Sequence, residues 1–352
     1  MTPRERFNAE AAKRILITDG AFGTEIQNWK LDEAAYAGDL GLSHDQKGNN
    51  DILAITRPDV PETITRAYLD AGSDIVSTNT FSANIISQAD YGAEHLVREI
   101  NVESARIARA LANEYEAKDG RPRFVAGAIG PTNKTLSLSP DVNDPGFREI
   151  DFDYLKGVYR EQIDALLEGG EGVGVDFILI ETVFDTLNAK AGIMAAIEAG
   201  DDLGRDVPIM LSMTLTDLSG RNLSGHTVEA FWHAVRHARP VTIGLNCSFG
   251  AEQLRPHVKT LSGIADTLIM IYPNAGLPNE LGEYDEMPVT TAGLVGEWAV
   301  AKQVNVLGGC CGSTPAHIKA MADGVRGLEP RAVASPEVRT KLAGLEPFTM
   351  AA

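Results

Sequence analysis

The stretch Phe177-Ile178-Leu179-Ile180-Glu181 is an unbroken apolar run that ends on a carboxylate. Such continuous hydrophobicity is typical of a parallel strand that is buried on both faces. Seven other segments have the same short, apolar and β-branched character, and longer segments with helical periodicity separate them. The eight predicted strands cover residues 15–19, 74–80, 124–130, 177–181, 208–214, 241–247, 267–274 and 304–310.

A predicted helix follows each of these strands. The clearest one covers residues 59–72, with Asp59 as its N-cap, Glu62 three residues later and Gly72 at its end. The others are expected at residues 84–117, 155–167, 189–200, 227–238, 251–263, 291–303 and 315–326. Strand-then-helix units in this number predict a single-domain α/β protein, a (β/α)8 TIM barrel, with a doubly wound open sheet as the alternative.

Two connections are long, at residues 20–57 and 131–150. Both follow the carboxyl end of a strand, where barrel enzymes build their active sites. The second connection is rich in Ser, Pro, Asn and Asp, which predicts an ordered lid or rim. We expect the barrel to occupy residues 1–328 and a tail or linker to occupy residues 329–352.

Composition limits the classes of partner. A formal net charge of −18 disfavours binding to a phosphate backbone, so no nucleic-acid partner is expected. No run approaches the roughly 18 apolar residues of a membrane span, and the charged start has no secretory signal. Three cysteines, an odd and sparse number, fit a reducing compartment, so the expected location is cytoplasmic.

All three cysteines fall at the carboxyl ends of two predicted strands. Cys247 ends the sixth strand, and Cys310 and Cys311 end the eighth. In a closed barrel these ends are close and face the same mouth. Free cysteines are often only small buried hydrophobic residues, but three thiolates also suit zinc and leave one position open for a substrate. The placement therefore predicts a zinc site at the mouth of the barrel.

The turn Gly308-Gly309-Cys310-Cys311-Gly312 allows a second interpretation. It leads into Ser313-Thr314-Pro315, a polar cap and early proline that start a helix. Barrels often bind phosphate after their last strands with such a turn and helix start. The two cysteines inside the turn favour a metal, and phosphate binding stays open.

The other strand ends carry no lysine or histidine, which disfavours a Schiff-base aldolase and a histidine-centred metallohydrolase. They do carry Asp19 and Glu181, two carboxylates suited to an ammonium group. Beside Asp19, the backbone N–H groups of Gly20 and Ala21 suit a carboxylate. Together these groups are typical of a site for an amino-acid zwitterion whose side chain points at the metal.

Three motifs resemble the homocysteine-binding methyltransferase family: Asp19-Gly20-Ala21-Phe22-Gly23-Thr24, Gly244-Leu245-Asn246-Cys247 and Gly308-Gly309-Cys310-Cys311-Gly312. Further stretches resemble the amino-terminal, homocysteine-binding module of cobalamin-dependent methionine synthase. They are Lys47-Gly48-Asn49-Asn50-Asp51, Gly130-Pro131-Thr132-Asn133, Ser139-Pro140-Asp141-Val142-Asn143-Asp144-Pro145, Glu181-Thr182-Val183-Phe184-Asp185-Thr186-Leu187-Asn188-Ala189-Lys190 and Pro273-Asn274-Ala275-Gly276-Leu277-Pro278. The resemblance covers nearly the whole chain.

The resemblance implies a zinc-dependent homocysteine S-methyltransferase with Cys247, Cys310 and Cys311 as catalytic zinc ligands and the homocysteine sulfur as the fourth ligand. Asp19 and Glu181 would hold the substrate amino group.

Three more groups match the family's substrate site. The backbone of Gly20–Ala21 matches the carboxylate contact. Asn246 lies in the second motif, and Asn274 matches a position that fills the open zinc site when substrate is absent.

The implied reaction passes a methyl group from methylcobalamin, ultimately from methyltetrahydrofolate, to the zinc thiolate of homocysteine and gives methionine. The sequence has no cobalamin-binding Asp-x-His-x-x-Gly motif, and it stops at Ala352. Either it is a piece of a longer chain, or the folate and cobalamin modules are separate polypeptides. We therefore expect methylcobalamin to be supplied in trans by a separate cobalamin- and folate-binding methionine synthase polypeptide.

Three alternatives remain at this point. A self-sufficient homocysteine methyltransferase would use betaine or S-methylmethionine, but such onium donors need an aromatic cage and aromatic residues are only 6% of the chain. A non-catalytic zinc- or thiol-binding protein leaves Asp19 and Glu181 on the same rim unexplained. A phosphate-binding, aldolase-like barrel is the third.

Overall fold

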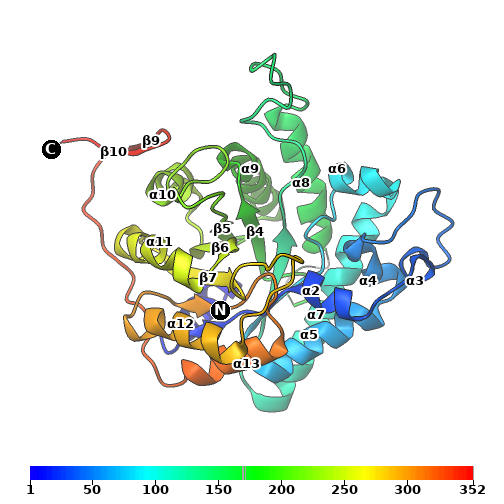
Figure 1. The fold of residues 1–352 in the computed structure, drawn as a ribbon, viewed down its shortest axis with the longest axis horizontal. Helices are drawn as coiled ribbons and strands as arrows, with labels where there is room; N and C mark the ends of the chain where they lie inside the picture. Colours follow the sequence, from blue (N-terminus) through cyan, green and yellow to red (C-terminus); the bar gives the residue numbers. More distant parts are fainter. Residues whose placement is uncertain (169, 171, 352) are drawn as a thin grey trace.

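A single parallel sheet of eight strands organises the chain (Figure 1). The computed structural model describes residues 1–168, 170 and 172–351. Its strands are β1 (Leu16–Ile17), β2 (Ile75–Ser77), β3 (Phe124–Ile129), β4 (Phe177–Val183), β5 (Ile209–Met213), β6 (Thr242–Gly250), β7 (Leu268–Asn274) and β8 (Val306–Leu307). They follow the order β1-β8-β7-β6-β5-β4-β3-β2. A parallel bridge between Thr18 and Ile75 joins the two edges, which confirms the predicted (β/α)8 barrel.

Helices form the outer ring of the barrel (Figure 1). The ring consists of α5 (Asp59–Ala71), α7 (Val97–Asp119), α8 (Phe152–Leu166), α9 (Thr186–Leu203), α10 (Val228–Val235), α11 (Ala251–Ile264), α12 (Pro288–Val300) and α13 (Pro315–Gly324). The remaining described α-helices are not part of this ring: α1 (Pro3–Ala11), α2 (Phe22–Asn28), α3 (Glu33–Ala37), α4 (Leu53–Thr56) and α6 (Ile85–Gln88). None of the described helices is long and apolar enough to cross a membrane.

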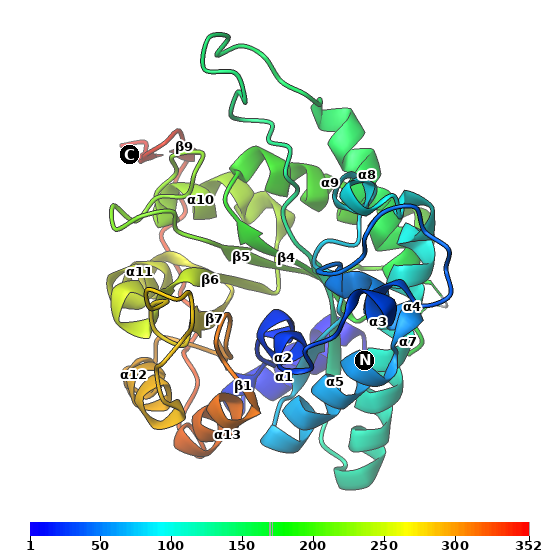
Figure 2. The same cartoon turned by 45° about the vertical axis from the view of Figure 1, so that its right-hand side comes forward.

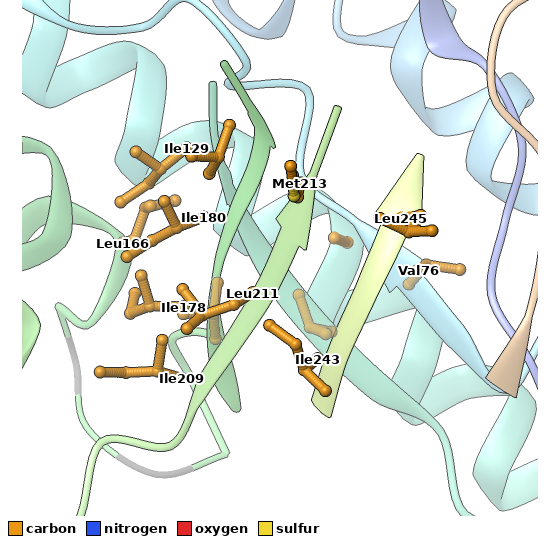
Figure 3. Close-up of a cluster of buried hydrophobic side chains, with 14 of the residues drawn as sticks. Val76, Ile129, Leu166, Ile178, Ile180, Ile209, Leu211, Met213, Ile243 and Leu245 are labelled. Carbon is orange, nitrogen blue, oxygen red and sulfur yellow. The ribbon is translucent and has the colours of Figure 1, made fainter. Parts of the chain in front are cut away.

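The two faces of the strands build two cores, because side chains alternate along a strand. Ile178, Ile180 and Leu211 belong to the layer between the sheet and the helices (Figure 3). Phe124 and Phe177 belong to the second core, in which Phe7 of α1 lies against both rings, with centroids 5.2 and 5.0 Å away. Helix α1 therefore contributes an aromatic side chain to the packing of the strands.

The carboxyl ends of β4 and β6 are irregular. The register of β4 with β5 shifts between Ile180 and Val183, and that of β6 with β7 shifts between Asn246 and Gly250. Thr182, Cys247 and Ser248 have left-handed φ values of 55°, 61° and 58°. Non-glycine residues in this region are uncommon, and they concentrate at functional sites because the surrounding structure must hold them there.

Two helix predictions were wrong in detail. Residues 84–117 are not one helix: α6 ends at Gln88, and α7 begins only at Val97. Gly92, with φ of 62°, lies in the break between them. Asp59 is the first residue of α5 rather than its N-cap, which is Pro58, because the Asp59 carboxylate instead accepts hydrogen bonds from Arg57.

The long connections differ in structure. Residues 20–57 contain α2, α3 and α4, whereas residues 131–150, all of them described, form neither helix nor strand and project from the barrel before α8 (Figure 2). The tail contains a hairpin of β9 (Lys341–Ala343) and β10 (Pro347–Thr349) that packs on α10. The division at residues 328 and 329 stays a prediction, and Ala352 lies outside the described residues.

Candidate metal and substrate site

The three thiols meet at the carboxyl ends of β6 and β8. Their Sγ atoms all lie within 4.8 Å of one another, and those of Cys247 and Cys311 are 3.7 Å apart. Backbone hydrogen bonds tie the cysteine pair to β7, since Cys310 N donates to the Pro273 oxygen and Ala275 N to the Cys311 oxygen. Three soft thiol donors this close together could hold one metal ion, and they suit zinc.

Close packing explains the glycines beside the cysteine pair. A Cβ atom on Gly308 would lie 2.2 Å from Cγ2 of Thr18, and one on Gly309 would lie 2.3 Å from Oγ of Ser313. No larger residue fits there without moving its neighbours. The helix start follows the prediction, because Thr314 is the N-cap of α13 and Pro315 its first residue.

The three thiols influence one another's ionisation. Hydrogen bonds with Cys247 and Cys311, together with burial, raise the pKa of Cys310 well above its ordinary value. Hydrogen bonds from Cys247 and Cys310 lower the pKa of Cys311 to about 3. Burial and their mutual contacts oppose the simultaneous ionisation of the three thiols, and a divalent cation would let them ionise together.

Asp19 follows β1 in the chain and is hydrogen-bonded to β2. It is 5% exposed, and its carboxylate accepts hydrogen bonds from Ser77 N at 2.6 Å, Ser77 Oγ at 3.1 Å and Thr18 Oγ1 at 3.1 Å. Burial outweighs these bonds and raises the pKa of Asp19 to about 6. A buried carboxylate with a raised pKa gains more from a nearby cation than an exposed one does, because the cation offsets the cost of burying its charge.

Glu181 lies at the end of β4, and the hydroxyl of Tyr272 on β7 donates to its Oε2 atom at 3.0 Å. Burial raises the pKa of Glu181 to about 8, and repulsion from Asp19 acts in the same direction. Tyr272 was not predicted. Its side chain lies on the same face of β7 as Leu268 and Met270 of the second core. A tyrosine hydroxyl buried at such a position needs a hydrogen-bond partner, and this signal could have identified it.

A cavity of about 690 Å³ contains the cysteines, Asp19 and Glu181 in its wall. It extends into a polar lobe formed by the connections after β1, β2 and β3, whose lining includes Asn49, Asn50, Asp51, Ser82, Asp90 and Asn133. Burial raises the pKa of Asp51 to about 7. No Lys, Arg or His lines the cavity among the described residues, so its electrostatics favour a cationic group.

The backbone at Gly20 and Ala21 also lines this cavity. Ala21 N donates to Ser313 Oγ at 3.3 Å, and the Tyr68 hydroxyl donates to the Ala21 oxygen at 3.0 Å. A Cβ atom on Gly20 would lie 2.8 Å from the Tyr68 ring. The segment is therefore fixed against α5 and the turn before α13, close to the thiols.

The two asparagines have different surroundings. Asn246 Oδ1 accepts from Ser212 Oγ at 2.6 Å and Thr182 N at 3.1 Å, and its Nδ2 donates to Thr182 Oγ1. Asn274 is buried, and its Oδ1 has no hydrogen-bond partner among the described residues. Neither is part of the cavity lining, and their predicted contacts with substrate stay predictions.

Three clustered thiols and two buried carboxylates lie together at the mouth of a closed (β/α)8 barrel, where barrel enzymes build their active sites. The profile of the homocysteine S-methyltransferase family matches residues 16–325. The chain belongs to this family, and it is a methyltransferase that methylates homocysteine.

Solved structures show the same fold. The metallated form of the homocysteine methyltransferase MmuM from Escherichia coli is 21% identical, with a TM-score of 0.69 over 92% of this chain and 99% of that one. The oxidized form is 20% identical, with a TM-score of 0.70 over the same shares. The apo form is 20% identical, with a TM-score of 0.64 over 92% of this chain and 100% of that one.

Proposed function

We propose that the chain is a zinc-dependent homocysteine S-methyltransferase with Cys247, Cys310 and Cys311 as its metal ligands. The observation that carries this proposal is the approach of all three Sγ atoms to within 4.8 Å of one another. The donor set suits zinc, since three thiolates leave a fourth position. The residues on either side of Asn274 hydrogen-bond to the cysteine pair, and its buried Oδ1 atom, which has no partner among the described residues, would offer a further oxygen donor.

The amino acid would bind through its charged groups. Asp19 and Glu181 would hold the ammonium group, because both carboxylates are buried in a cavity whose described lining has no cationic side chain. The Gly20–Ala21 backbone would face the substrate carboxylate. These contacts would fix the amino-acid end, so that the side chain of homocysteine points toward the cysteines.

When bound, zinc would keep the homocysteine sulfur deprotonated near neutral pH, whereas a free thiol with a pKa of about 8.5 is mostly protonated. The sulfur then forms a bond to the methyl carbon while the bond between that carbon and its donor breaks. The product is methionine, a neutral thioether. The protein supplies orientation, because the fixed amino-acid end directs the sulfur along one line of approach.

The proposed donor is methylcobalamin, supplied in trans by a separate cobalamin- and folate-binding methionine synthase polypeptide. Support comes from the stretches at residues 47–51, 139–145 and 181–190 that resemble the methionine synthase module. The unpaired thiols also support a reducing, cytoplasmic location. We further propose that residues 329–352 are a tail or linker next to the barrel.

A second candidate is a self-sufficient enzyme with a small onium donor such as betaine or S-methylmethionine. The polar lobe favours it, because Asp51 and Asp90 line that lobe together with the aromatic rings of Phe81 and Tyr91. Carboxylates and aromatic faces both attract an onium cation.

The deciding experiment measures conversion of homocysteine to methionine by the zinc-loaded chain with free methylcobalamin, betaine or S-methylmethionine. Turnover with methylcobalamin alone, lost in Cys310→Ala, supports the first proposal. Efficient turnover with an onium donor supports the second candidate instead. Turnover that persists unchanged in Cys310→Ala would refute the role of the thiols.

A further inference from the structure

The connection between β7 and α12, whose path Figure 2 shows, and the first turn of α12 expose several large apolar side chains. Leu281, Val289, Met287 and Leu277 are 83%, 76%, 63% and 51% exposed. Side chains of this size are costly to leave in water when they gather in one segment, and exposed apolar groups with a polar surround mark interaction sites. We name residues 277–289 the acidic rim.

Its charge has one sign. The acidic rim carries Glu280, Glu283, Asp285 and Glu286, and the chain has no Lys, Arg or His between residues 260 and 301. Within the described part of the chain, none of these four acids forms a salt bridge. The surface therefore combines apolar side chains with uncompensated negative charge.

The acidic rim is preorganised rather than loose. Asn279 Oδ1 accepts hydrogen bonds from Leu281 N and Glu283 N, and Asn279 Nδ2 donates to Asp285. A bridge between Pro278 and Tyr284 closes the turn. Leu281 is thus presented at the tip of an ordered turn, which lowers the entropic cost of docking.

The acidic rim also borders the thiol site. A Cβ atom on Gly312, the residue after Cys311, would lie 2.3 Å from Cβ of Tyr284, and His317 of α13 contacts the Glu286 oxygen at 2.8 Å. A protein seated on the acidic rim would therefore stand next to the mouth through which a methyl group must reach the sulfur.

We infer that the acidic rim is the docking surface for the protein that delivers the methyl group, and that the partner's contact face is basic and apolar. This inference rests on the proposed in-trans donor. A second copy of this chain fits poorly, since a net charge of −18 would set acidic surface against acidic surface. The basic face of a partner would complement the acids and speed its association.

The test uses a fluorescently labelled, methylcobalamin-loaded cobalamin-binding module of a methionine synthase as the probe. Its binding to the zinc-loaded full chain is followed by anisotropy at low and high salt. We expect Kd to rise with salt, and to rise at least 10-fold in Glu280→Lys/Leu281→Ser/Glu283→Lys. The control Glu161→Lys/Leu203→Ser changes an exposed acid and an exposed leucine on α8 and α9 and should leave Kd unchanged.

Equal Kd values for the wild type and the rim variant, or no binding at low salt, would overturn the inference. So would sedimentation of the wild-type chain as a dimer that the rim substitutions dissociate. Turnover separates the two proposals. If the module binds through the acidic rim but transfers no methyl group, the rim is its docking surface and the module is refuted as the methyl donor. If methyl transfer is equally fast in the rim variant, the module is the donor and the rim is refuted as its docking surface.

Discussion

The hydroxyl of Tyr272 on β7 donates a hydrogen bond to Glu181 Oε2 on β4, at 3.0 Å. The two residues come from strands that are not neighbours in the sheet, so the bond crosses the top of the barrel. It fixes one of the two carboxylates that we assign to the substrate ammonium group. It also opposes, without cancelling, the effect of burial on the pKa of Glu181.

Binding of an amino acid should release a proton from Glu181. With a pKa of about 8 against an ordinary 4.5, this carboxyl is mostly protonated at pH 7, and a bound ammonium favours the charged form. Calorimetry with methionine, which has no thiol proton, in buffers of different ionisation enthalpy should show the release at pH 7 and its decline above pH 8. Glu181→Gln should abolish it and weaken binding about 10-fold or more, while Glu161→Gln should do neither.

Tyr272→Phe should move the pH profile of methionine binding upward. The hydrogen bond from Tyr272 lowers the pKa of Glu181, so its loss leaves the carboxyl protonated to a higher pH. The variant should also lose about 1 kcal/mol of stability, the net contribution of a typical hydrogen bond. Tyr115→Phe removes a comparable bond to Asp70 on the outer helices, and the binding profile should stay in place. An unmoved profile in Tyr272→Phe would argue against Glu181 as the ammonium partner.

Zinc should stabilise the wild-type chain and not its cysteine variants. A ligand that binds only the folded state adds about 4 kcal/mol at 1,000 times its Kd. We expect a higher Tm with zinc, a fall on chelation and about one bound ion per chain by elemental analysis. Cys247→Ala, Cys310→Ala and Cys311→Ala should each lose most of the bound ion and of the Tm response. A full complement of zinc in Cys310→Ala would remove that residue from the ligand set.

Gly244→Ala should prevent proper folding. A Cβ atom there would lie 1.6 Å from the Met270 carbonyl oxygen on β7, and neither backbone can yield without separating two paired strands. We expect a loss of more than about 3 kcal/mol, measured by denaturant unfolding. Gly293→Ala is the matched control: its Cβ would meet nothing within 4 Å inside α12, so a gain of about 0.5–1 kcal/mol is expected.

The sequence allowed the fold and the thiol cluster to be predicted because both depend on position along strands. Continuous apolar runs located the strands, and Cys247, Cys310 and Cys311 could be placed at one mouth by counting strand ends. The same reasoning placed Asp19 and Glu181 at the same mouth of the barrel. None of these steps needs knowledge of side-chain conformation.

Other features depend on competition between partners, which a linear pattern does not record. Asp59 pairs with Arg57 instead of capping α5, and Gly92 interrupts what periodicity presents as one helix. Asp51 follows two asparagines in a connection, and only the folded structure shows that it is buried in the cavity wall. There its carboxylate accepts a hydrogen bond from the backbone N–H of Ser82. The left-handed φ values of Cys247 and Ser248 likewise depend on the register shift of β6.

The contact between β1 and β2, which we call the seam, closes the barrel and also involves a residue that we assign to substrate binding. Beyond the Thr18–Ile75 bridge, the carboxylate of Asp19 crosses this seam to Ser77, and the same carboxylate is proposed to bind the ammonium group. A bound amino acid would hold Asp19 in the charged form that accepts both Ser77 hydrogen bonds. Amide protons on either side of the seam should therefore exchange with deuterium more slowly in the complex, while those between β5 and β6 keep their rates. Binding of the substrate would therefore stabilise the closure of the barrel between β1 and β2.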